Sequence, residues 1–368
     1  MKPMKRSVLI AVVAMMAAMG AQAQKVVVVD TEGNGVPYAS VMTAEAEFVG
    51  VTDLDGVLAD AKGNTDITVT HVAYKPKQVK VSGDTRVVLE DAGFALAEIT
   101  VQPKPLVYVQ TYYRLFLFDE KDGMAYYRAG LTDNVYDREK KKVSASTDHA
   151  AKAKYGILKT ILGMFGSKFD AISEIKARKL EDRMIEAGKP VGLTISDVRP
   201  GRKQISDRWG TLGLITDGNG QRRFSYDAQK LYKDMLKAEG KTKKLEKAAK
   251  KEELRKNMEE SLFTIFRIDE DGNYAPEDFV AKEFIKSFDE LKKDRETGTE
   301  EYVHYSYGIQ VFTIERAYVT KNELKQKKKD NKMKMNYQSI QQFERQNNIP
   351  PLAPPIQKKL AELWKVSE

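Results

Sequence analysis

The chain has 368 residues, and none of them is cysteine. A protein without cysteine has no disulfide bonds, no thiolate zinc site, no cysteine nucleophile and no cysteine-linked lipid. Histidine is nearly as scarce, with only His71, His149 and His304. A zinc peptidase needs histidine in a His-x-x-Glu or His-Glu-x-x-His arrangement, because three protein ligands must hold the metal. No histidine here fits, so we predict no metal, no cofactor and no metallopeptidase activity.

Long apolar runs are missing after the N-terminal segment. Basic residues at positions 2, 5 and 6 precede an apolar run over 8–19, and Ala21-Gln22-Ala23 follows it. This order is typical of a secretory signal peptide, and the run is shorter than the roughly 20 residues that cross a bilayer as a helix. We predict that residues 1–23 are a signal peptide. The rest should be soluble in the periplasm or outside the cell, in a Gram-negative envelope, with no transmembrane segment.

Acidic residues are in the minority, since 53 Asp and Glu stand against 61 Lys and Arg, a formal net charge of +8. The excess is concentrated in two lysine-rich segments, 237–256 and 321–334. Such blocks are usually solvated helices or linkers, and export makes nucleic acid an unsuitable partner. We expect solvated segments. The alternative is binding to an anionic envelope surface, with peripheral membrane association.

Short strand-like segments recur over residues 24–102. Turns rich in Gly, Asn and Asp separate them, as at 53–56 and 83–84. Several short strands at this spacing, with no helical pattern among them, predict an all-β sandwich. The segments cover 26–29, 39–43, 48–52, 66–72, 78–81, 86–89 and 98–101.

The order of four motifs in this region resembles the carboxypeptidase regulatory-like domain, a transthyretin-like (prealbumin-like) sandwich. The motifs are Val28-Val29-Asp30 leading to Gly35-Val36-Pro37-Tyr38-Ala39-Ser40-Val41, then Gly50-Val51-Thr52-Asp53-Leu54-Asp55-Gly56, Ile67-Thr68-Val69-Thr70-His71-Val72-Ala73-Tyr74, and Leu96-Ala97-Glu98-Ile99-Thr100-Val101. The same module resembles the N-terminal extension of TonB-dependent outer-membrane receptors. In the family the domain is noncatalytic, so the resemblance implies a binding or accessory module.

Pro103-Lys104-Pro105 marks the end of this region, because two prolines disfavour both helix and central strand. Residues 106–118 and 302–319 each alternate apolar and polar positions, the period of a strand. We predict that these two segments pair in one sheet, although they lie at opposite ends of the following domain. Hairpins are predicted between 106–118 and 126–128, and between 212–215 and 222–226.

Helical patterns interrupt these strands. Apolar spacing predicts one helix over 157–175, or a pair of helices broken near 163–166. Capping residues predict a helix over 227–238, and Pro276-Glu277-Asp278 opens one through residue 292. Residues 103–348 therefore indicate an α+β domain with an antiparallel sheet and helical insertions. Residues 349–368 follow as a proline-rich strap with a final helix over 356–365. The expected fold is mixed: an N-terminal sandwich, then this α+β domain.

Catalytic motifs are also missing. Ser173 and Lys176 have the Ser-x-x-Lys spacing of a serine nucleophile, but no Lys-Thr-Gly accompanies them. Neither a Gly-x-Ser-x-Gly elbow nor a Walker-type phosphate loop occurs. Residues 53–56 and 269–273 resemble calcium loops, but their glycine comes fourth rather than sixth, and we interpret them as turns. We predict no catalytic residue.

Tyrosines are the most suggestive side chains of the predicted strands. Exposed tyrosines on a sheet can stack on sugar rings or receive a peptide strand. The alternative is packing, because aromatic pairs stabilise sheets. The residues of this predicted binding face are Tyr108, Tyr112, Tyr126, Tyr302 and His304.

The leading functional hypothesis is a noncatalytic protein of the periplasm or cell envelope, whose sandwich is a binding or accessory module for a protein or glycan partner. The first alternative is a hydrolase of glycosidase type with its carboxylates in the C-terminal domain, because two carboxylates can meet in space from any sequence positions without a short motif. The second alternative is binding to an anionic surface, through the lysine-rich segments.

Overall fold

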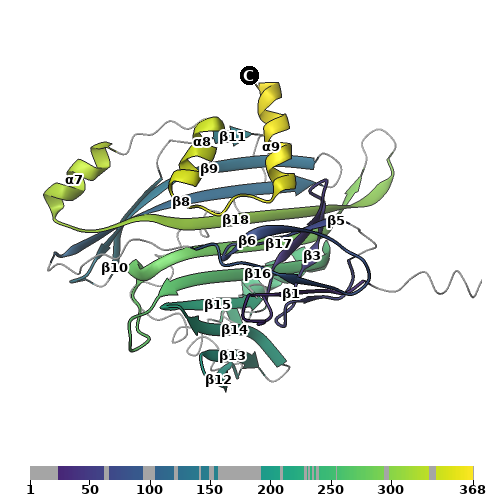
Figure 1. Cartoon of the computed structure of the whole chain (residues 1–368), viewed down its shortest axis with the longest axis horizontal. Coiled ribbons are helices and arrows are strands. Elements are labelled where there is room, and N and C mark those ends of the chain that lie inside the picture. The colour runs from purple at the N-terminus through teal and green to yellow at the C-terminus, as the bar shows by residue number, and fades with distance from the viewer. Residues whose placement is uncertain are drawn as a thin grey trace, which may run out of the picture.

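The computed structural model is mostly β-structure, arranged in several sheets (Figure 1). The predicted signal peptide, the strand over 98–101, the helix over 157–175 and His149 lie outside the described residues. Among the helices that are described, none is both long and apolar enough to cross a membrane. The structure describes residues 24–61, 66–93, 104–119, 123–140, 142–148, 153–155, 192–207, 210–227, 230, 233, 236–237, 240–253, 255–293, 298–330 and 337–367.

Residues 24–93 fold into two small sheets, which we call the N-terminal unit. One sheet has the strand order β4-β1-β7 and the other has β3-β2-β5-β6. Val26 and Val28 of the first sheet share a buried core with Val41 and Val69 of the second. Branched side chains on these pleated surfaces thus hold the two sheets together. The strands are β1 (Val26–Val29), β2 (Ser40–Thr43), β3 (Phe48–Val51), β4 (Val57–Leu58), β5 (Asp66–His71), β6 (Tyr74–Lys80) and β7 (Thr85–Val88).

Two glycines allow a close approach of backbones at the start of this unit. Gly56 has a φ of +78°, and its carbonyl accepts a hydrogen bond from the Val28 N–H at 2.7 Å. At Gly35 a β-carbon would lie 2.1 Å from the carbonyl oxygen of Asp55. The predicted turn over 53–56 is confirmed by the hydrogen bond from the Gly56 N–H to the Asp53 carbonyl. Only glycine fits these two positions, because any side chain would separate the turn from β1.

An eleven-stranded antiparallel sheet makes up most of the remaining structure. Its strand order is β10-β9-β8-β18-β17-β16-β15-β14-β13-β12, and β11 also pairs with β9. β8 and β18 are direct neighbours, so the predicted long-range pairing is confirmed. The predicted hairpins are present as β8–β9 and β14–β15. The strands are β8 (Leu106–Asp119), β9 (Gly123–Asp137), β10 (Lys142–Asp148), β11 (Ala153–Tyr155), β12 (Thr194–Arg199), β13 (Arg202–Asp207), β14 (Gly210–Gly218), β15 (Gln221–Asp227), β16 (Arg255–Arg267), β17 (Phe279–Lys293) and β18 (Glu300–Val319).

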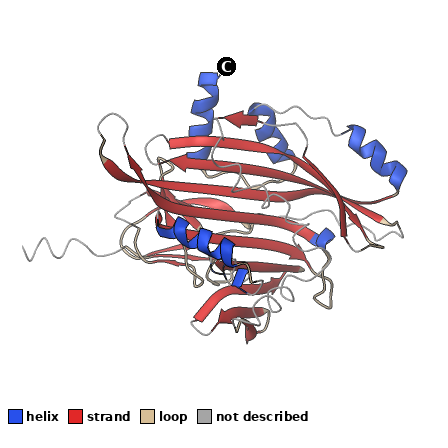
Figure 2. Ribbon diagram, turned by 180° about the vertical axis from the view of Figure 1, so that it is seen from behind, coloured by secondary structure: helices blue, strands red, loops and turns tan. Residues whose placement is uncertain are grey.

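The two faces of this sheet are covered differently. The N-terminal unit and the C-terminal helices α8 (Tyr337–Gln346) and α9 (Pro354–Ser367) lie on one face (Figure 1). That face contributes Tyr112 and Phe312 to the core of the N-terminal unit and α8. The helix α6 (Thr242–Glu253) lies on the opposite face, which is seen from behind in Figure 2. A second apolar cluster, including Leu115 and Ile309, occupies that side.

The helix predicted over 276–292 is wrong. Pro276–Asp278 forms a single 3-10 turn, η2, and the chain then continues as β17. The proline and the acidic residues of 276–278 do start a helical turn, but the turn ends at Asp278. β17 pairs with β16 on one side and β18 on the other. These two hydrogen-bonded ladders outweigh the local helical pattern, because intrinsic propensity is a weak preference that tertiary pairing overrides.

The lysine-rich segments and the C-terminal strap agree with their predictions in part. α6 lies within the first segment, and α7 (Lys321–Asp330) lies within the second. Residues 349–353 have no regular structure and lead into α9. The sequence did not predict α8. Of the helix predicted over 227–238, residues 227, 230, 233, 236 and 237 are described. Asp227 ends β15, and the other four are helical.

A chain of buried polar side chains joins the sheet to both coverings. Arg114 on β8 is 1% exposed. Its Nη1 donates to Glu344 Oε1 on α8 at 2.9 Å, and its Nη2 donates to the carbonyl of Pro350 at 2.8 Å. Its Nε donates to Gln310 Oε1 on β18 at 2.6 Å. One guanidinium therefore fixes α8 and the strap to the centre of the sheet.

The same series of hydrogen bonds continues into the N-terminal unit. Gln310 Nε2 donates to Glu283 Oε1 at 2.5 Å, and Glu283 Oε2 accepts from the Val72 N–H at 3.0 Å. Glu283 lies on β17, and Val72 lies in the turn between β5 and β6. Burial raises the pKa of Glu283, while the donors Gln310 and Val72 favour its charged form. Each polar group in this hydrogen-bonded series, from Arg114 through Gln310 and Glu283 to Val72, thus has a partner in a different segment.

The tip of the β5–β6 hairpin makes further contacts with the sheet. The His71 ring packs edge-on against Phe263 of β16, with centroids 4.2 Å apart. Arg223 of β15 donates to the Tyr74 hydroxyl at 3.1 Å and to Asp91 Oδ2 at 2.8 Å. The β5–β6 hairpin thus docks on the sheet by apolar and polar contacts together. Other parts of the unit also contact the sheet, as Asp91 does after β7 and as Tyr38 does through its hydroxyl, which donates to the Leu212 carbonyl at 3.5 Å.

Replacing Arg114 should destabilise the whole molecule. We expect Arg114→Ala to lower the free energy of unfolding by about 3–5 kcal/mol, because the buried Glu344 carboxylate loses its cationic partner and Gln310 Oε1 loses its donor. Urea denaturation of residues 24–368 measures this change. The control is Lys75→Ala, whose pair with Glu90 is 60% and 69% exposed and should contribute less than about 1 kcal/mol. Equal, small losses in both variants would contradict the account.

His71 should make docking sensitive to acid. Burial, together with the Arg223 guanidinium, lowers its pKa to about 3. Below the ordinary pKa of about 6.5 the unfolded chain binds a proton that the folded chain does not. We therefore expect proton binding by His71 in the unfolded state to lower the free energy of unfolding by about 3 kcal/mol as the pH falls from 7 to 4.5. His71→Asn should show a flatter dependence in denaturation measured at both pH values; an unchanged slope would exclude His71 as the cause.

Candidate functional site

The five residues of the predicted binding face do not form one exposed surface. Tyr108 and Tyr112 are fully buried. The Tyr108 hydroxyl donates to Asp133 Oδ1 at 2.6 Å, and the Tyr112 hydroxyl donates to Glu344 Oε1 at 2.7 Å. Tyr126 lies on β9 opposite Leu117, and its side chain is not among those that the structure describes. The buried tyrosines thus belong to the polar packing of β8, and Tyr112 shares Glu344 with Arg114.

Tyr302 and His304, in contrast, lie together near the start of β18. In the register with β17, Tyr302 pairs with Leu291 and His304 pairs with Asp289. Paired and alternate residues of antiparallel strands share one face, so these four side chains are neighbours. Tyr302 and Leu291 are each 44% exposed. An exposed apolar pair therefore stands beside a histidine–carboxylate pair.

Asp289 is held from two sides. Its Oδ1 lies 2.6 Å from His304 Nδ1, and its Oδ2 accepts from Asn257 Nδ2 at 2.6 Å. Asn257 sits in a β-bulge of β16, between Lys256 and Glu259, with a φ of +48°. A bulge re-aims side chains next to it, and Asn is among the residues that tolerate this left-handed backbone. The bulge thus places the amide on Asp289.

Two more side chains complete the constellation. Phe48 of β3 stacks on the His304 ring, with centroids 5.9 Å apart and an interplanar angle of 10°. The Lys256 ammonium lies 4.0 Å from the centroid of the Tyr302 ring, a cation–π contact. We call this group the strand-end site. It consists of Phe48, Lys256, Asn257, Asp289, Leu291, Tyr302 and His304.

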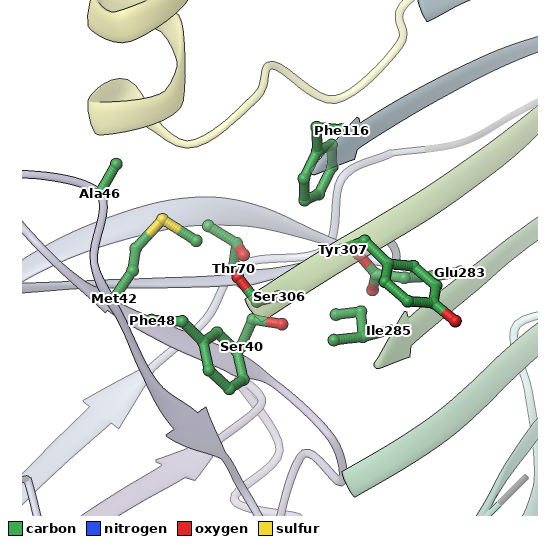
Figure 3. Close-up of a pocket in the computed structure, with 10 residues that line it drawn as sticks. All are labelled: Ser40, Met42, Ala46, Phe48, Thr70, Phe116, Glu283, Ile285, Ser306 and Tyr307. Atoms are coloured by element: carbon green, nitrogen blue, oxygen red, sulfur yellow. The ribbon is translucent and has the colours of Figure 1, made fainter. Parts of the chain in front are cut away.

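A small cavity adjoins this site between the N-terminal unit and the sheet. Figure 3 shows Phe48 and Met42 on one side of it and Glu283 on the other, with Phe116 above. Its volume is about 20 Å³, enough for one water molecule. The Ser40 Oγ is buried and has no hydrogen-bond partner among the described residues, so it suits such a water. The cavity therefore suits a bridging water and is too small for a larger ligand.

A second polar cluster lies at the opposite end of β18. Glu277 of η2 is 7% exposed, and its Oε2 has no partner among the described residues. Arg316 of β18 donates to Asp278 Oδ1 at 2.5 Å. Burial raises the pKa of Glu277 to about 7, with a further rise from Asp278 and opposition from Arg138 and Arg316. This acid carries its proton near neutrality because the surroundings do not compensate its charge.

Sequence reasoning found Tyr302 and His304 but missed the residues that organise them. Asp289 fell within the segment predicted as a helix, where it could not pair with His304. The bulge at Asn257 and the contact of Phe48 with His304 depend on pairing between distant strands. No local sequence pattern predicts them. Within the residues that the structure describes, no cluster of His, Asp and Glu is arranged to hold a metal ion.

Comparisons with known proteins give no family. No protein-family model matches the chain, and no curated protein matches its sequence. Among solved structures, one titled "Lipid-protein interactions in lipovitellin" is similar over 60% of this chain and 26% of that chain, at 7% sequence identity and a TM-score of 0.26. The match thus spans about a quarter of that protein. A likeness at this level does not bear on the function of this chain.

Glu277 should make stability fall as the pH rises. The folded state keeps a proton that the unfolded state releases near pH 4.5, so stability is lost between pH 4.5 and pH 7. We expect a loss of about 3 kcal/mol over that window from this residue. Glu277→Gln removes the titration, and chemical denaturation at pH 4.5 and pH 7.5 should then show a smaller difference. If wild type and variant change equally with pH, Glu277 does not titrate in this way.

Proposed function

We propose that this chain is an exported, noncatalytic protein of the cell envelope that binds a glycan or protein partner through the strand-end site. The N-terminal unit is, in this proposal, a carboxypeptidase regulatory-like sandwich that serves as a binding module. Two features support that assignment: the order of its motifs, and the glycine-dependent contact between the 53–56 turn and β1. The predicted signal peptide supports export.

One observation carries the proposal. Tyr302 and Leu291 are neighbouring large apolar side chains that each remain 44% exposed. Only two other large apolar residues, Val88 and Val198, are exposed among the described residues. Rigid aromatic side chains provide contact area at a low cost in conformational entropy. A held, exposed ring next to fixed polar groups is the arrangement expected of a binding face.

The N-terminal unit takes part in this face. Phe48 comes from β3, whereas its stacking partner His304 comes from β18. The docking of the unit on the sheet, through the β5–β6 hairpin and Glu283, fixes how Phe48 approaches. The N-terminal unit therefore contributes one residue of the site, Phe48, and holds it against His304. Lysine side chains exposed on α6, such as Lys243 and Lys247, offer a further, peripheral contact with anionic envelope surfaces.

A hydrolase is the second candidate. A carboxylate that orients a histidine, as Asp289 does for His304, also occurs in enzymes that activate a serine. Ser306 lies two residues further along β18 and lines the adjoining cavity. Hydrolysis of peptides, esters or glycosides by wild type, lost in Asp289→Asn, would favour this candidate over the binding function.

The test compares envelope binding by two matched variants of residues 24–368. Tyr302→Ala/Leu291→Ser removes the exposed pair, and Val88→Ser/Val198→Ser removes the two separate exposed valines on β7 and β12. Fluorescently labelled proteins are titrated with envelope fragments from a Gram-negative bacterium, after thermal denaturation has shown equal folding. We expect at least about a tenfold loss of affinity for the first variant, because truncating anchors costs about 2 kcal/mol or more. Equal affinity of both variants would contradict the proposal.

A further inference from the structure

The strand-end site has the chemistry of a saccharide platform, and we propose that its ligand is an uncharged oligosaccharide. The inference rests on the proposed function and specifies its ligand. Tyr302 and Leu291 form a half-exposed apolar patch on paired strands. A pyranose ring has one face of C–H groups that packs on such a surface, while its hydroxyls point to the sides. The patch is the size of a side-chain pair, which suits one or two sugar rings.

The polar groups around the patch suit hydroxyl ligands. Asp289 offers carboxylate oxygens, Lys256 offers an ammonium, and Asn257 has an amide with donor and acceptor. A hydroxyl both donates and accepts, so it needs neighbours of both kinds. A few placed polar groups beside an apolar surface are what fixes a small ligand in its site.

The charge balance distinguishes an uncharged ligand from a polyanion. Lys256 contributes one positive charge and Asp289 one negative charge within the same face. The lysine-rich helix α6 ends three residues before Lys256, but it lies on the opposite face of the sheet, and α7 follows the other end of β18. A polyanionic chain would meet Asp289 directly beside the ring, where like charges repel. An uncharged saccharide meets no such penalty.

The site is also organised before a ligand arrives. Asp289 is held by both His304 and Asn257, and Phe48 stacks on His304. Lys256 already rests on one side of the Tyr302 ring. Fewer groups therefore have to be ordered on binding, which favours affinity for a small ligand.

The experiment titrates residues 24–368 by calorimetry with cellohexaose, maltohexaose, mannohexaose and xylohexaose, and with hexagalacturonate as the anionic comparison. We expect at least one uncharged hexasaccharide to bind with an affinity that changes less than about twofold between 50 and 500 mM NaCl, because screening affects only charged ligands. Tyr302→Ala should weaken it at least tenfold. Tyr302→Phe should stay within about threefold, since it keeps the ring, and Val198→Ser should match wild type.

The outcomes separate this inference from the proposed function. Binding of hexagalacturonate alone, with affinity lost in salt, would overturn the uncharged-saccharide assignment. So would the absence of any saccharide binding when envelope binding still depends on Tyr302, a result that leaves the proposed function standing and points to a protein partner. Saccharide binding that Tyr302→Ala leaves unchanged would place the site elsewhere. No binding to saccharides or envelope would overturn both.

Discussion

The buried guanidinium of Arg114 is the constraint on which the rest of the arrangement depends. A charge at 1% exposure is tolerated only when its hydrogen bonds are satisfied, and here its partners are Glu344, Gln310 and Pro350. Gln310 in turn donates to Glu283, and Glu283 accepts from the Val72 N–H of the N-terminal unit. The stability of the core strands, of α8 and of the N-terminal unit is therefore coupled. Removing any one of them would leave buried polar groups without partners.

This dependence also positions the residues of the proposed binding face at the strand ends. The His304–Asp289 pair belongs to the sheet, but Phe48 belongs to the N-terminal unit. Their stacking requires the unit to be fixed relative to the sheet, and the buried chain supplies that fixation. The same strand, β18, carries buried Gln310 in the middle and exposed Tyr302 near its start. Its interior part holds the parts of the molecule together, and its end remains accessible to a ligand.

The sequence alone predicted the parts that local periodicity controls. Strict alternation in 106–118 and 302–319 predicted β8, β18 and their pairing. The spacing of Val280, Phe284 and Phe288 fits a helix as well as a strand, and only the neighbouring strands decide between them. Likewise, Tyr108 and Tyr302 look alike in sequence, yet one is buried with Asp133 and the other exposed. Burial is set by what covers each face, and the covering segments are distant in the chain.

Hydrogen exchange at the Val72 amide tests the central claim, that the N-terminal unit and the sheet form one body. This amide lies in a turn, and its acceptor is the Glu283 carboxylate of another strand, so a free unit would expose it to water. The account predicts exchange through global unfolding only, as slow as that of the β8 and β18 amides. Exchange within seconds, while β8 and β18 stay protected, would show that the unit moves independently and would contradict the account.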